Sequence, residues 1–323
     1  MTEPSSLRIA TRGSALALWQ TDHAVEILRD YARRTHSSVD ISVRTITTRG
    51  DTDQSPVLAG KLGKGFFTQE LEAALRAGEI DFAVHSLKDL PTESPADLAI
   101  AAILPRASKH DLLLARNDSL REGSPQQLPL VPGATVGSSS LRRSALIRRY
   151  ATGARSTPLR GNVPTRLKKL ANGEYDAIVL AAAGVERLAL DLAPFAAFDL
   201  NPRVWVPAPG QGAVAIQCRA NDADVRTLLG AVSDAATADD TAHERLYLQG
   251  LEGGCTTPFG CVVDGKDLCV GLDVNGRWRG AIVARAGADR ARLLAALEAA
   301  EFHEATGGEW LYRKHRPAGV QVA

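Results

Sequence analysis

The chain has 323 residues, of which 45% are hydrophobic and 23% are charged, and its formal net charge is +1. This length predicts two or three domains, and the composition is that of an ordinary globular protein. The near-neutral charge gives no reason to expect a nucleic-acid-binding protein, so any anion site has to come from a local cluster of arginine and lysine side chains.

The cysteine spacings and the lengths of the apolar runs give no indication of a metalloprotein, a secreted protein or a membrane protein. The four cysteines form no C-x-x-C pair and have no histidine at a zinc-type spacing, so no metal site is expected; they are Cys218, Cys255, Cys261 and Cys269. Residues 1–7 have neither the basic nor the apolar region of a signal peptide. No stretch approaches the roughly 20 apolar residues that span a bilayer. The sequence therefore predicts a cytoplasmic protein without a membrane segment.

The N-terminal third alternates apolar strands with amphipathic helices. Strands are expected over 7–11, 39–47, 81–84 and 98–104, and helices from the N-cap Ser14 and over 67–78. The alternating apolar residues of the 39–47 strand indicate one buried face. The strands deliver Arg12, Ser14, Lys88 and Asp89 to the carboxyl edge of a sheet, where open α/β sheets build their sites.

A second lobe repeats this pattern. Strands are expected over 112–115, 134–137, 176–183 and 213–218, the last rejoining the first sheet, and a further strand is expected to end at 159–162. Helices are expected to be capped by Ser138–Ser140 and by Asn162. Arg142 and Arg143 lie in the first turn of a helix, where positive charge opposes the helix dipole by up to about 1 kcal/mol. A compensating anion is therefore expected, which makes this turn a candidate carboxylate site; a solvated basic face is the alternative.

The C-terminal part does not continue the alternation of strands and helices seen in the two lobes. A helix is expected over 235–251, a hairpin over 268–283 around Asn275-Gly276, and another helix over 286–300. Cys255 follows two glycines and precedes residues that favour a loop, which leaves its sulfur little steric protection; an incidental buried cysteine is the alternative. The expected domains are lobe 1 (1–104 and 211–230), lobe 2 (105–210) and a C-terminal domain (231–323).

Together these groups point to a polyanionic substrate held in a cleft. Guanidinium groups bind carboxylates with two parallel hydrogen bonds, a carboxylic acid such as Asp89 moves protons, and a thiol can hold an intermediate covalently. The expected carboxylate ligands are Arg12, Lys88, Arg142, Arg143, Arg160 and Arg166.

An ordered set of motifs resembles the porphobilinogen deaminase family, whose members are also called hydroxymethylbilane synthases. The motifs are Ala10-Thr11-Arg12, Thr48-Arg49-Gly50-Asp51, Val84-His85-Ser86-Leu87-Lys88-Asp89, Ser139-Ser140-Leu141-Arg142-Arg143, Arg160-Gly161-Asn162-Val163, Gly210-Gln211-Gly212-Ala213 and Glu252-Gly253-Gly254-Cys255. The resemblance runs from about Leu7 to Gly260. It implies an α/β fold of two doubly wound lobes like those of type II periplasmic binding proteins, plus a small α+β C-terminal domain.

The resemblance also implies an activity. Family members join four porphobilinogen molecules head to tail, with loss of ammonia at each step, on a covalent dipyrromethane primer, and release linear hydroxymethylbilane. Here the implied catalytic acid is Asp89, and the implied attachment is a thioether to Cys255. The other implied cofactor contacts are Lys88, Asp89, Ser139, Arg142, Arg143 and Arg160. The implied substrate contacts are Arg12, Ser14, Lys64, Phe67, Arg160, Arg166 and Gln211.

The implied partners are the small-molecule substrate porphobilinogen and uroporphyrinogen III synthase, which takes up the product; a monomer that binds neither nucleic acid nor membrane is expected. The sequence departs from the family pattern in two places. In the loop 60–65, Lys61 is displaced by one and Leu62 replaces a glycine, and His110 stands where an arginine is common. We expect neither to abolish activity. The alternatives are a non-catalytic hinged binder of carboxylated ligands and, more weakly, a nucleic-acid-binding protein that uses the basic run 142–149. A covalent adduct on Cys255 separates the enzyme from the binder.

Overall fold

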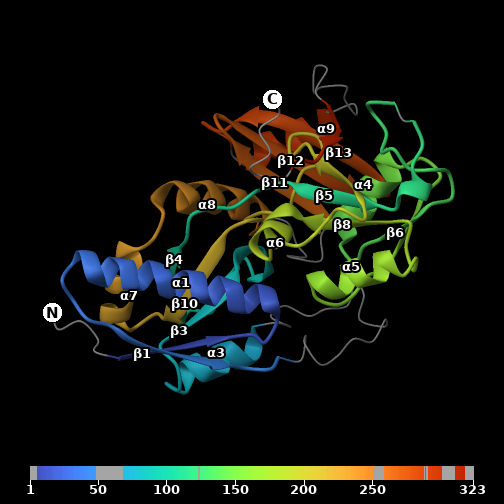
Figure 1. Ribbon diagram of the computed structural model, residues 1–323. Coiled ribbons are helices and arrows are strands. Elements are labelled where there is room, and N and C mark those ends of the chain that lie inside the picture. Colours follow the sequence, from blue (N-terminus) through green and yellow to red (C-terminus); the bar gives the residue numbers. More distant parts are fainter. Residues whose placement is uncertain are drawn as a thin grey trace. The chain divides into compact units, whose positions relative to one another are not determined.

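The computed structural model describes residues 6–48, 68–122, 124–249, 258–286, 288, 290–299 and 310–316. The chain falls into two units, each formed by two separate segments (Figure 1). Unit 1 comprises Met1–Ala107 and Pro209–Thr257, and unit 2 comprises Ser108–Ala208 and Pro258–Ala323. Among the described residues, no helix has both the length and the apolar character needed to cross a membrane.

Unit 1 is built on a five-stranded mixed sheet with the strand order β2-β1-β3-β10-β4. Its strands are β1 (Ser6–Thr11), β2 (Asp40–Thr45), β3 (Phe82–Ser86), β4 (Leu98–Ile103) and β10 (Val214–Arg219). β1 runs parallel to β2 and β3, whereas β10 runs antiparallel to β3 and β4. The return of β10 to this sheet confirms the crossing that the sequence predicted.

Helices cover both faces of this sheet. They are α1 (Ala15–Arg34), α3 (Gln69–Arg76) and α7 (Ala223–Ala231). Successive side chains of a strand point to opposite faces. Ile9 and Val84 accordingly pack in one cluster with residues of α1 and α7, while Ala10 and Ala83 pack with residues of α3. Unit 1 is therefore a doubly wound lobe, as predicted.

The edge strand β2 differs from its prediction. The alternating residues over 39–47 predicted one buried face, but every side chain of β2 except Ile41 is exposed, and Val43 is 45% exposed. The predicted buried face is present only in part: Val39 and Ile41 pack against the core of unit 1, whereas Val43 does not. Alternation shows only that a strand has two unlike faces. Whether a helix covers either face depends on the rest of the fold.

Helix α8 (Ala235–Gln249) belongs to unit 1. It begins after Asp234, whose carboxylate accepts a hydrogen bond from the Thr237 amide at 2.7 Å and so acts as the N-cap. The sequence grouped this helix with the C-terminal domain, whereas in the structure it lies in unit 1 and the C-terminal strands lie in unit 2. The division into three domains stays a prediction.

Unit 2 is built on a six-stranded mixed sheet with the order β14-β9-β5-β8-β6-β7. Its strands are β5 (Asp111–Ala115), β6 (Thr135–Gly137), β7 (Arg155–Thr157), β8 (Ala177–Ala181), β9 (Ala196–Leu200) and β14 (Tyr312–Lys314), and its helices include α4 (Leu141–Tyr150), α5 (Val163–Ala171) and α6 (Ala182–Arg187). The buried strand β8 runs parallel to β6 and antiparallel to β5.

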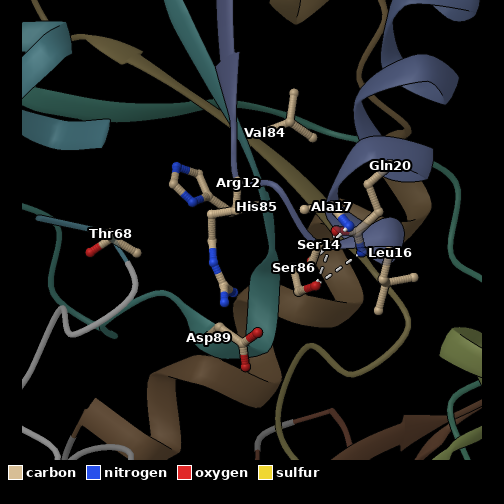
Figure 2. A pocket seen from close by; sticks show the side chains of 10 residues that line it. All are labelled: Arg12, Ser14, Leu16, Ala17, Gln20, Thr68, Val84, His85, Ser86 and Asp89. Carbon is tan, nitrogen blue, oxygen red and sulfur yellow. Dashed lines mark hydrogen bonds between the residues drawn. The ribbon is translucent and has the colours of Figure 1, made fainter. Parts of the chain in front are cut away.

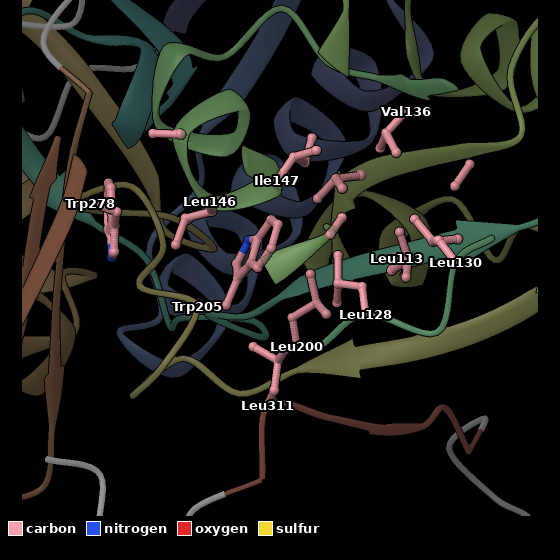
Figure 3. Close-up of a cluster of buried hydrophobic side chains, with 14 of the residues drawn as sticks. Leu113, Leu128, Leu130, Val136, Leu146, Ile147, Leu200, Trp205, Trp278 and Leu311 are labelled. Carbon is pink, nitrogen blue, oxygen red and sulfur yellow. The ribbon is translucent and has the colours of Figure 1, made fainter. Parts of the chain in front are cut away.

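Opposite faces of this sheet carry α4 on one side and α5 with α6 on the other. The side chains of α4 share their core with a small antiparallel sheet, in the order β11-β12-β13, and Trp205 and Trp278 lie in this core (Figure 3). The strands of this sheet are β11 (Phe259–Asp264), β12 (Asp267–Val274) and β13 (Arg277–Ala284), and α9 (Arg290–Ala299) follows them.

Two local features set the β12–β13 hairpin. Asn275 and Gly276 have positive φ angles of 53° and 79°, which confirms the predicted Asn-Gly turn. Gly271 faces the Trp278 indole, and a Cβ at Gly271 would lie 2.2 Å from Cζ2 of that ring. The hairpin therefore requires glycine at 271 so that the indole can lie flat against the strand.

Asp199 of β9 ties the C-terminal strand to unit 2. Its Oδ1 accepts hydrogen bonds from His110 Nε2 at 3.0 Å and from His315 Nδ1 at 2.7 Å, and Arg313 Nε lies 3.4 Å from Oδ2. Burial alone would raise the pKa of Asp199, but the bonds from both histidines hold it at about 2. His110, the departure from the family pattern, thus contacts a carboxylate of its own chain.

We expect Asp199 to make unit 2 sensitive to acid. Its folded pKa lies below the unfolded value of about 3.9, so its contribution to stability is complete above that value and is lost as the pH falls through about 2. Asp199→Asn should remove ~2 kcal/mol from the free energy of unfolding at pH 7 and almost nothing at pH 2. Urea unfolding at both pH values measures this. The exposed Glu174→Gln is the control, and equal losses for the two variants at pH 7 would contradict the assignment.

Candidate active site

Asp89 lies in a short turn that directly follows β3. The turn is the 3-10 segment Leu87–Asp89. Leu87 and Leu90 on either side are buried, at 1% and 2% exposure, whereas Asp89 is exposed. The Leu87 amide donates to the Ala213 carbonyl at 3.0 Å, which attaches the turn to the start of β10. The two leucines therefore anchor the turn in the core and leave the carboxylate at the surface of unit 1.

A small pocket of about 80 Å³ lies beside this turn. It is lined by Arg12, Ser14, Leu16, Ala17, Gln20, Thr68, Val84, His85, Ser86 and Asp89. Figure 2 shows the guanidinium of Arg12 and the carboxylate of Asp89 facing the same space, although they come from different strand ends. A cation beside a carboxylate suits a small ligand that carries both a carboxylate and an ammonium group.

Hydrogen bonds at the N-terminus of α1 fix the part of the pocket that contains Arg12. Ser14 Oγ accepts a hydrogen bond from the Ala17 amide at 3.3 Å, so Ser14 is the N-cap of α1, as predicted. The hydroxyl of Thr11, the last residue of β1, donates to the Ala17 carbonyl at 3.1 Å. These bonds fix the tight connection from β1 to α1, which carries Arg12.

Two residues that line the pocket, Gln20 and Thr68, were not predicted as site residues from the sequence. Gln20 is 2% exposed, and its amide bonds to Ser86 Oγ at 2.9 Å, which links α1 to the end of β3. Gln20 could have been predicted to have a polar partner, because it lies on the apolar, buried side of α1 and a buried amide requires a hydrogen-bond partner. Thr68, which also lines the pocket, had no comparable signal.

His85 forms part of the floor of the pocket and was expected beyond the end of the strand. It instead lies within β3 and is 6% exposed. Burial, with the positive charge of Arg12 as the second cause, lowers the pKa of His85 to about 4. The imidazole is therefore neutral near pH 7 and adds no charge beside Arg12.

A buried ion pair holds the two chain segments through which unit 1 continues into unit 2. Arg106 donates from Nη1 and Nη2 to the two carboxylate oxygens of Glu244, on α8, at 2.7 and 2.9 Å. Arg106 Nε donates to the Gln211 carbonyl at 2.9 Å, and the Gly210 amide donates to Glu244 at 2.7 Å. The two side chains are 8% and 0% exposed. Both segments are thereby fixed to one helix of unit 1.

The amide of Gln211 positions Lys88. Gln211 is 0% exposed, and its Oε1 accepts a hydrogen bond from Lys88 Nζ at 3.3 Å. Gln211 thus fixes the ammonium group of Lys88, which is the residue that precedes Asp89 in the sequence. A direct contact between Gln211 and substrate stays a prediction.

In unit 2, Arg142 and Arg143 are buried around one carboxylate. Asp111, at the start of β5, accepts hydrogen bonds from Arg142 Nη2 at 3.0 Å and from Arg143 Nε and Nη2 at 3.1 and 2.7 Å. The Trp205 indole donates to the same carboxylate at 3.0 Å, and the Val206 and Val179 carbonyls accept from the two arginines. Asp111 is 0% exposed, and Arg142 and Arg143 are 4% and 7% exposed.

The compensating anion that the first turn of α4 requires is therefore present within the chain. The sequence placed a ligand carboxylate at this position, but the structure gives both guanidiniums the carboxylate of Asp111. Their expected contact with a cofactor stays a prediction. The structure adds a role in the core, because α4 is tied to β5 and to Trp205 through this network.

Arg160 differs from these two arginines in how many of its N–H groups are bonded. Arg142 has one buried nitrogen, Nε, without a hydrogen-bond partner among the described residues, and both of its Nη atoms are bonded. In Arg160 both Nε and Nη2 are buried without such a partner. Arg160 lies in a loop between β7 and α5; the sequence extended the strand through this loop, but β7 ends at Thr157. Ser139 Oγ holds the loop, because it donates to the Leu159 carbonyl at 2.8 Å and accepts from the Leu159 amide at 3.1 Å.

The N-terminus of α5 follows immediately. Asn162 Oδ1 accepts from the Thr165 amide at 2.9 Å and caps the helix, as predicted. Arg166 Nε donates to the Gly161 carbonyl at 2.7 Å, which holds its guanidinium near the same loop. Buried N–H groups are normally hydrogen-bonded, so the Nε and Nη2 groups of Arg160 require an acceptor. A ligand carboxylate fits this requirement, because it offers two oxygens to one guanidinium.

The structure thus brings Arg12, Ser14 and Asp89 together in unit 1, and Ser139, Arg160 and Arg166 together in unit 2. The predicted residues Cys255, Lys64 and Phe67, and the displaced Lys61, lie outside the described residues. The other three cysteines are buried. Within the described ranges, no group of three or more histidine, cysteine or acidic side chains could hold a metal ion.

Comparisons with known proteins agree on one family. Residues 7–227 match the family model "Porphobilinogen deaminase, dipyromethane cofactor binding domain". The chain is 43% identical over 266 residues to a porphobilinogen deaminase of Xanthomonas axonopodis pv. citri, which covers 82% of this chain and 84% of the relative. It is 44% identical over 272 residues to the porphobilinogen deaminase of Bordetella parapertussis, covering 84% and 83%.

A solved structure, the periplasmic VFT2 domain of Bordetella pertussis BvgS, matches 75% of this chain and 92% of its own length. Its sequence identity is 16% and its TM-score is 0.42, so nothing about the site follows from this likeness.

Proposed function

The chain belongs to the porphobilinogen deaminase family, and from that premise we propose which of its residues carry the reaction. It is a transferase of tetrapyrrole biosynthesis that condenses porphobilinogen with loss of ammonia and yields hydroxymethylbilane, and its cofactor is dipyrromethane. The observation that carries the residue assignment is the pocket in which Arg12 and Asp89 face one another. Porphobilinogen carries two carboxylates and an aminomethyl group, which are the complementary charges.

The residues of unit 2 fit the carboxylates of dipyrromethane. We assign Arg160 as the principal contact, since its buried Nε and Nη2 have no acceptor among the described residues. Arg166 and Ser139 support it by fixing the same loop. Cys255 is the proposed point of covalent attachment. When bound, the cofactor supplies a terminal pyrrole ring of the same kind as the ring to be added, and so serves as the primer.

Asp89 carries the proton chemistry in this proposal. Arg12 binds a substrate carboxylate and Ser14 stands beside it, which places the aminomethyl group next to Asp89. Asp89 and the aminomethyl nitrogen share one proton in this proposal. Asp89 gives it to the neutral amine, the ammonium group that results leaves as ammonia, and the Asp89 carboxylate stabilises the positive charge that develops on the substrate carbon. Because His85 is neutral, the substrate carboxylate is bound by the guanidinium of Arg12 rather than by an imidazolium.

A direct assay tests the activity. Purified protein incubated with porphobilinogen should release one ammonia for each substrate consumed and accumulate hydroxymethylbilane, which is detected after conversion to uroporphyrin. Isothermal binding measurements run in parallel distinguish the alternative of a non-catalytic binder. Saturable binding with unchanged porphobilinogen and no ammonia would contradict the proposal.

We expect Arg160→Gln to impair cofactor loading. A hydrogen bond to a charged group contributes about 1.5–3 kcal/mol, which corresponds to about 10- to 100-fold in carboxylate binding. The fraction of molecules that carry the dipyrromethane mass should therefore fall strongly. Intact-mass spectrometry measures this fraction, with the exposed Arg155→Gln of β7 as the matched control. Equal loading in the two variants would contradict the role of Arg160.

We also propose that the protein acts in the cytoplasm as a monomer and that uroporphyrinogen III synthase takes up its product. The support is its family membership, since the substrate and product are small polyanions made and used by successive enzymes. Light scattering after size-exclusion chromatography should give a mass close to 34.3 kDa. A mass of twice that value across the working concentration range would contradict the monomer.

A further inference from the structure

Arg245 on α8 contacts the backbone on both sides of Asp89. Its Nη1 donates to the carbonyls of Leu87 and Leu90, each at 3.2 Å, and its Nη2 donates to the Pro91 carbonyl at 2.5 Å. A single guanidinium therefore bonds to three carbonyl oxygens of the segment that carries Asp89. These bonds join residues more than 150 positions apart in the sequence, at separations of 158, 155 and 154.

The turn needs such a support. A 3-10 segment of one turn leaves most of its carbonyls without partners inside the segment. Here the Leu90 amide bonds to the Leu87 carbonyl at 3.2 Å. The planar, rigid fork of arginine can satisfy several carbonyls in one fixed geometry, which the flexible point charge of lysine cannot reproduce. The backbone position of Asp89 thus depends on Arg245 as well as on the buried leucines.

The neighbouring residue on α8 makes a second set of contacts. Glu244 bonds to Arg106 and to the Gly210 amide, as described above. Gly210 passes close to the Asp89 turn: its φ is +73°, and a Cβ there would lie 2.9 Å from Leu87 Cγ. Two consecutive residues of α8 therefore hold the Asp89 turn and the chain segment packed against it. The same helix ends at Gln249, a short distance before Cys255 in the sequence.

We propose that Arg245 is a positioning residue for the deamination step and that it acts through Asp89. It holds the Asp89 backbone to α8, so that the carboxylate meets the aminomethyl carbon of a substrate bound by Arg12. This inference rests on the proposed function of Asp89. The residue touches no reacting atom, and its contribution is the placement of the carboxylate.

Arg245→Gln should lower kcat by about 10- to 100-fold, because small misplacements of a catalytic group have effects of this size. KM for porphobilinogen should change less than about 3-fold, because Arg12 stays in place. Arg245→Lys should recover part of kcat. The matched control is Arg226→Gln on α7, which also removes an arginine–carbonyl bond in unit 1, but to Ala220 and not to the Asp89 turn.

The experiment measures kcat and KM per mole of folded, cofactor-loaded enzyme, with loading from intact mass and assays well below each melting temperature. It is repeated in an Asp89→Glu background. Since Arg245 acts through Asp89, Arg245→Gln should reduce kcat there by less than about 2-fold, because residues that act as a unit are not additive. A lower melting temperature with unchanged kcat, as for a purely structural arginine, would overturn the inference. Equal losses in both backgrounds would overturn it too. An inactive, unloaded wild-type protein would instead refute the proposed function.

Discussion

Asp89→Asn is expected to lower kcat by about 10²- to 10⁴-fold, the range typical of a lost general acid. Asparagine keeps the size of the side chain, but it neither gives a proton to the departing amine nor offers a negative charge to the cation that forms. The turn itself should persist, because it is held by Leu87, Leu90 and Arg245 rather than by the carboxylate. The loss should therefore appear in kcat without a comparable fall in melting temperature.

Ammonia release in a single turnover measures this effect most directly, because it isolates the step in which the proton moves. Glu93→Gln is the control, since it removes an exposed carboxylate a few residues further along the same segment. Its kcat should match that of the wild-type protein. An Asp89→Asn protein with more than a tenth of wild-type kcat would show that another group supplies the proton.

Asp111→Asn should produce the largest loss of stability. Removing one partner of a buried ion pair costs about 3–5 kcal/mol, because the remaining charge stays buried without compensation. Here two guanidiniums and an indole N–H bond to one carboxylate that is 0% exposed. The neutral asparagine amide leaves the positive charges of Arg142 and Arg143 side by side without an anion. Its NH₂ group also replaces a carboxylate oxygen, so it faces N–H donors to which it cannot accept a hydrogen bond.

Thermal and urea unfolding of Asp111→Asn measure this loss. Asp118→Asn is the control, because it breaks an exposed pair with Arg116 in the same unit. Exposed pairs contribute 0–1 kcal/mol, so this variant should unfold almost like the wild-type protein. A similarly small loss for Asp111→Asn would mean that Arg142 and Arg143 do not depend on Asp111, and it would favour their predicted role as ligand contacts.

The features predicted correctly from sequence are those with short-range causes. Ser14 and Asn162 cap their helices because a side-chain oxygen reaches an amide three residues on. The Asn275-Gly276 turn follows from the ease with which these residues adopt positive φ. One long-range feature was also predicted: the crossing of β10 into the first sheet, which was inferred from the Pro- and Gly-rich linker before the apolar strand 213–218.

The features that were missed depend on partners far away in the sequence. The bond between Arg142 on α4 and Asp111 was missed because Asp111 lies 31 residues earlier, on β5; the role of Arg142 as a ligand contact stays a prediction. The bonds from Arg245 to the Asp89 turn were missed for the same reason, because the two segments are more than 150 residues apart in the sequence. Strand β14 has only three residues and is held through Asp199, so it lacks a periodic pattern of its own. No local pattern specifies such pairings, because they arise only once the sheets have formed.

The central claim is that this chain builds hydroxymethylbilane on a dipyrromethane attached to Cys255. Intact-mass spectrometry of the purified protein, followed by peptide mapping, tests it most directly. We expect a mass increase equal to one dipyrromethane, located on the peptide that contains Cys255 and absent from Cys255→Ala. A bare thiol at Cys255 that stays unmodified after incubation with porphobilinogen would contradict the account.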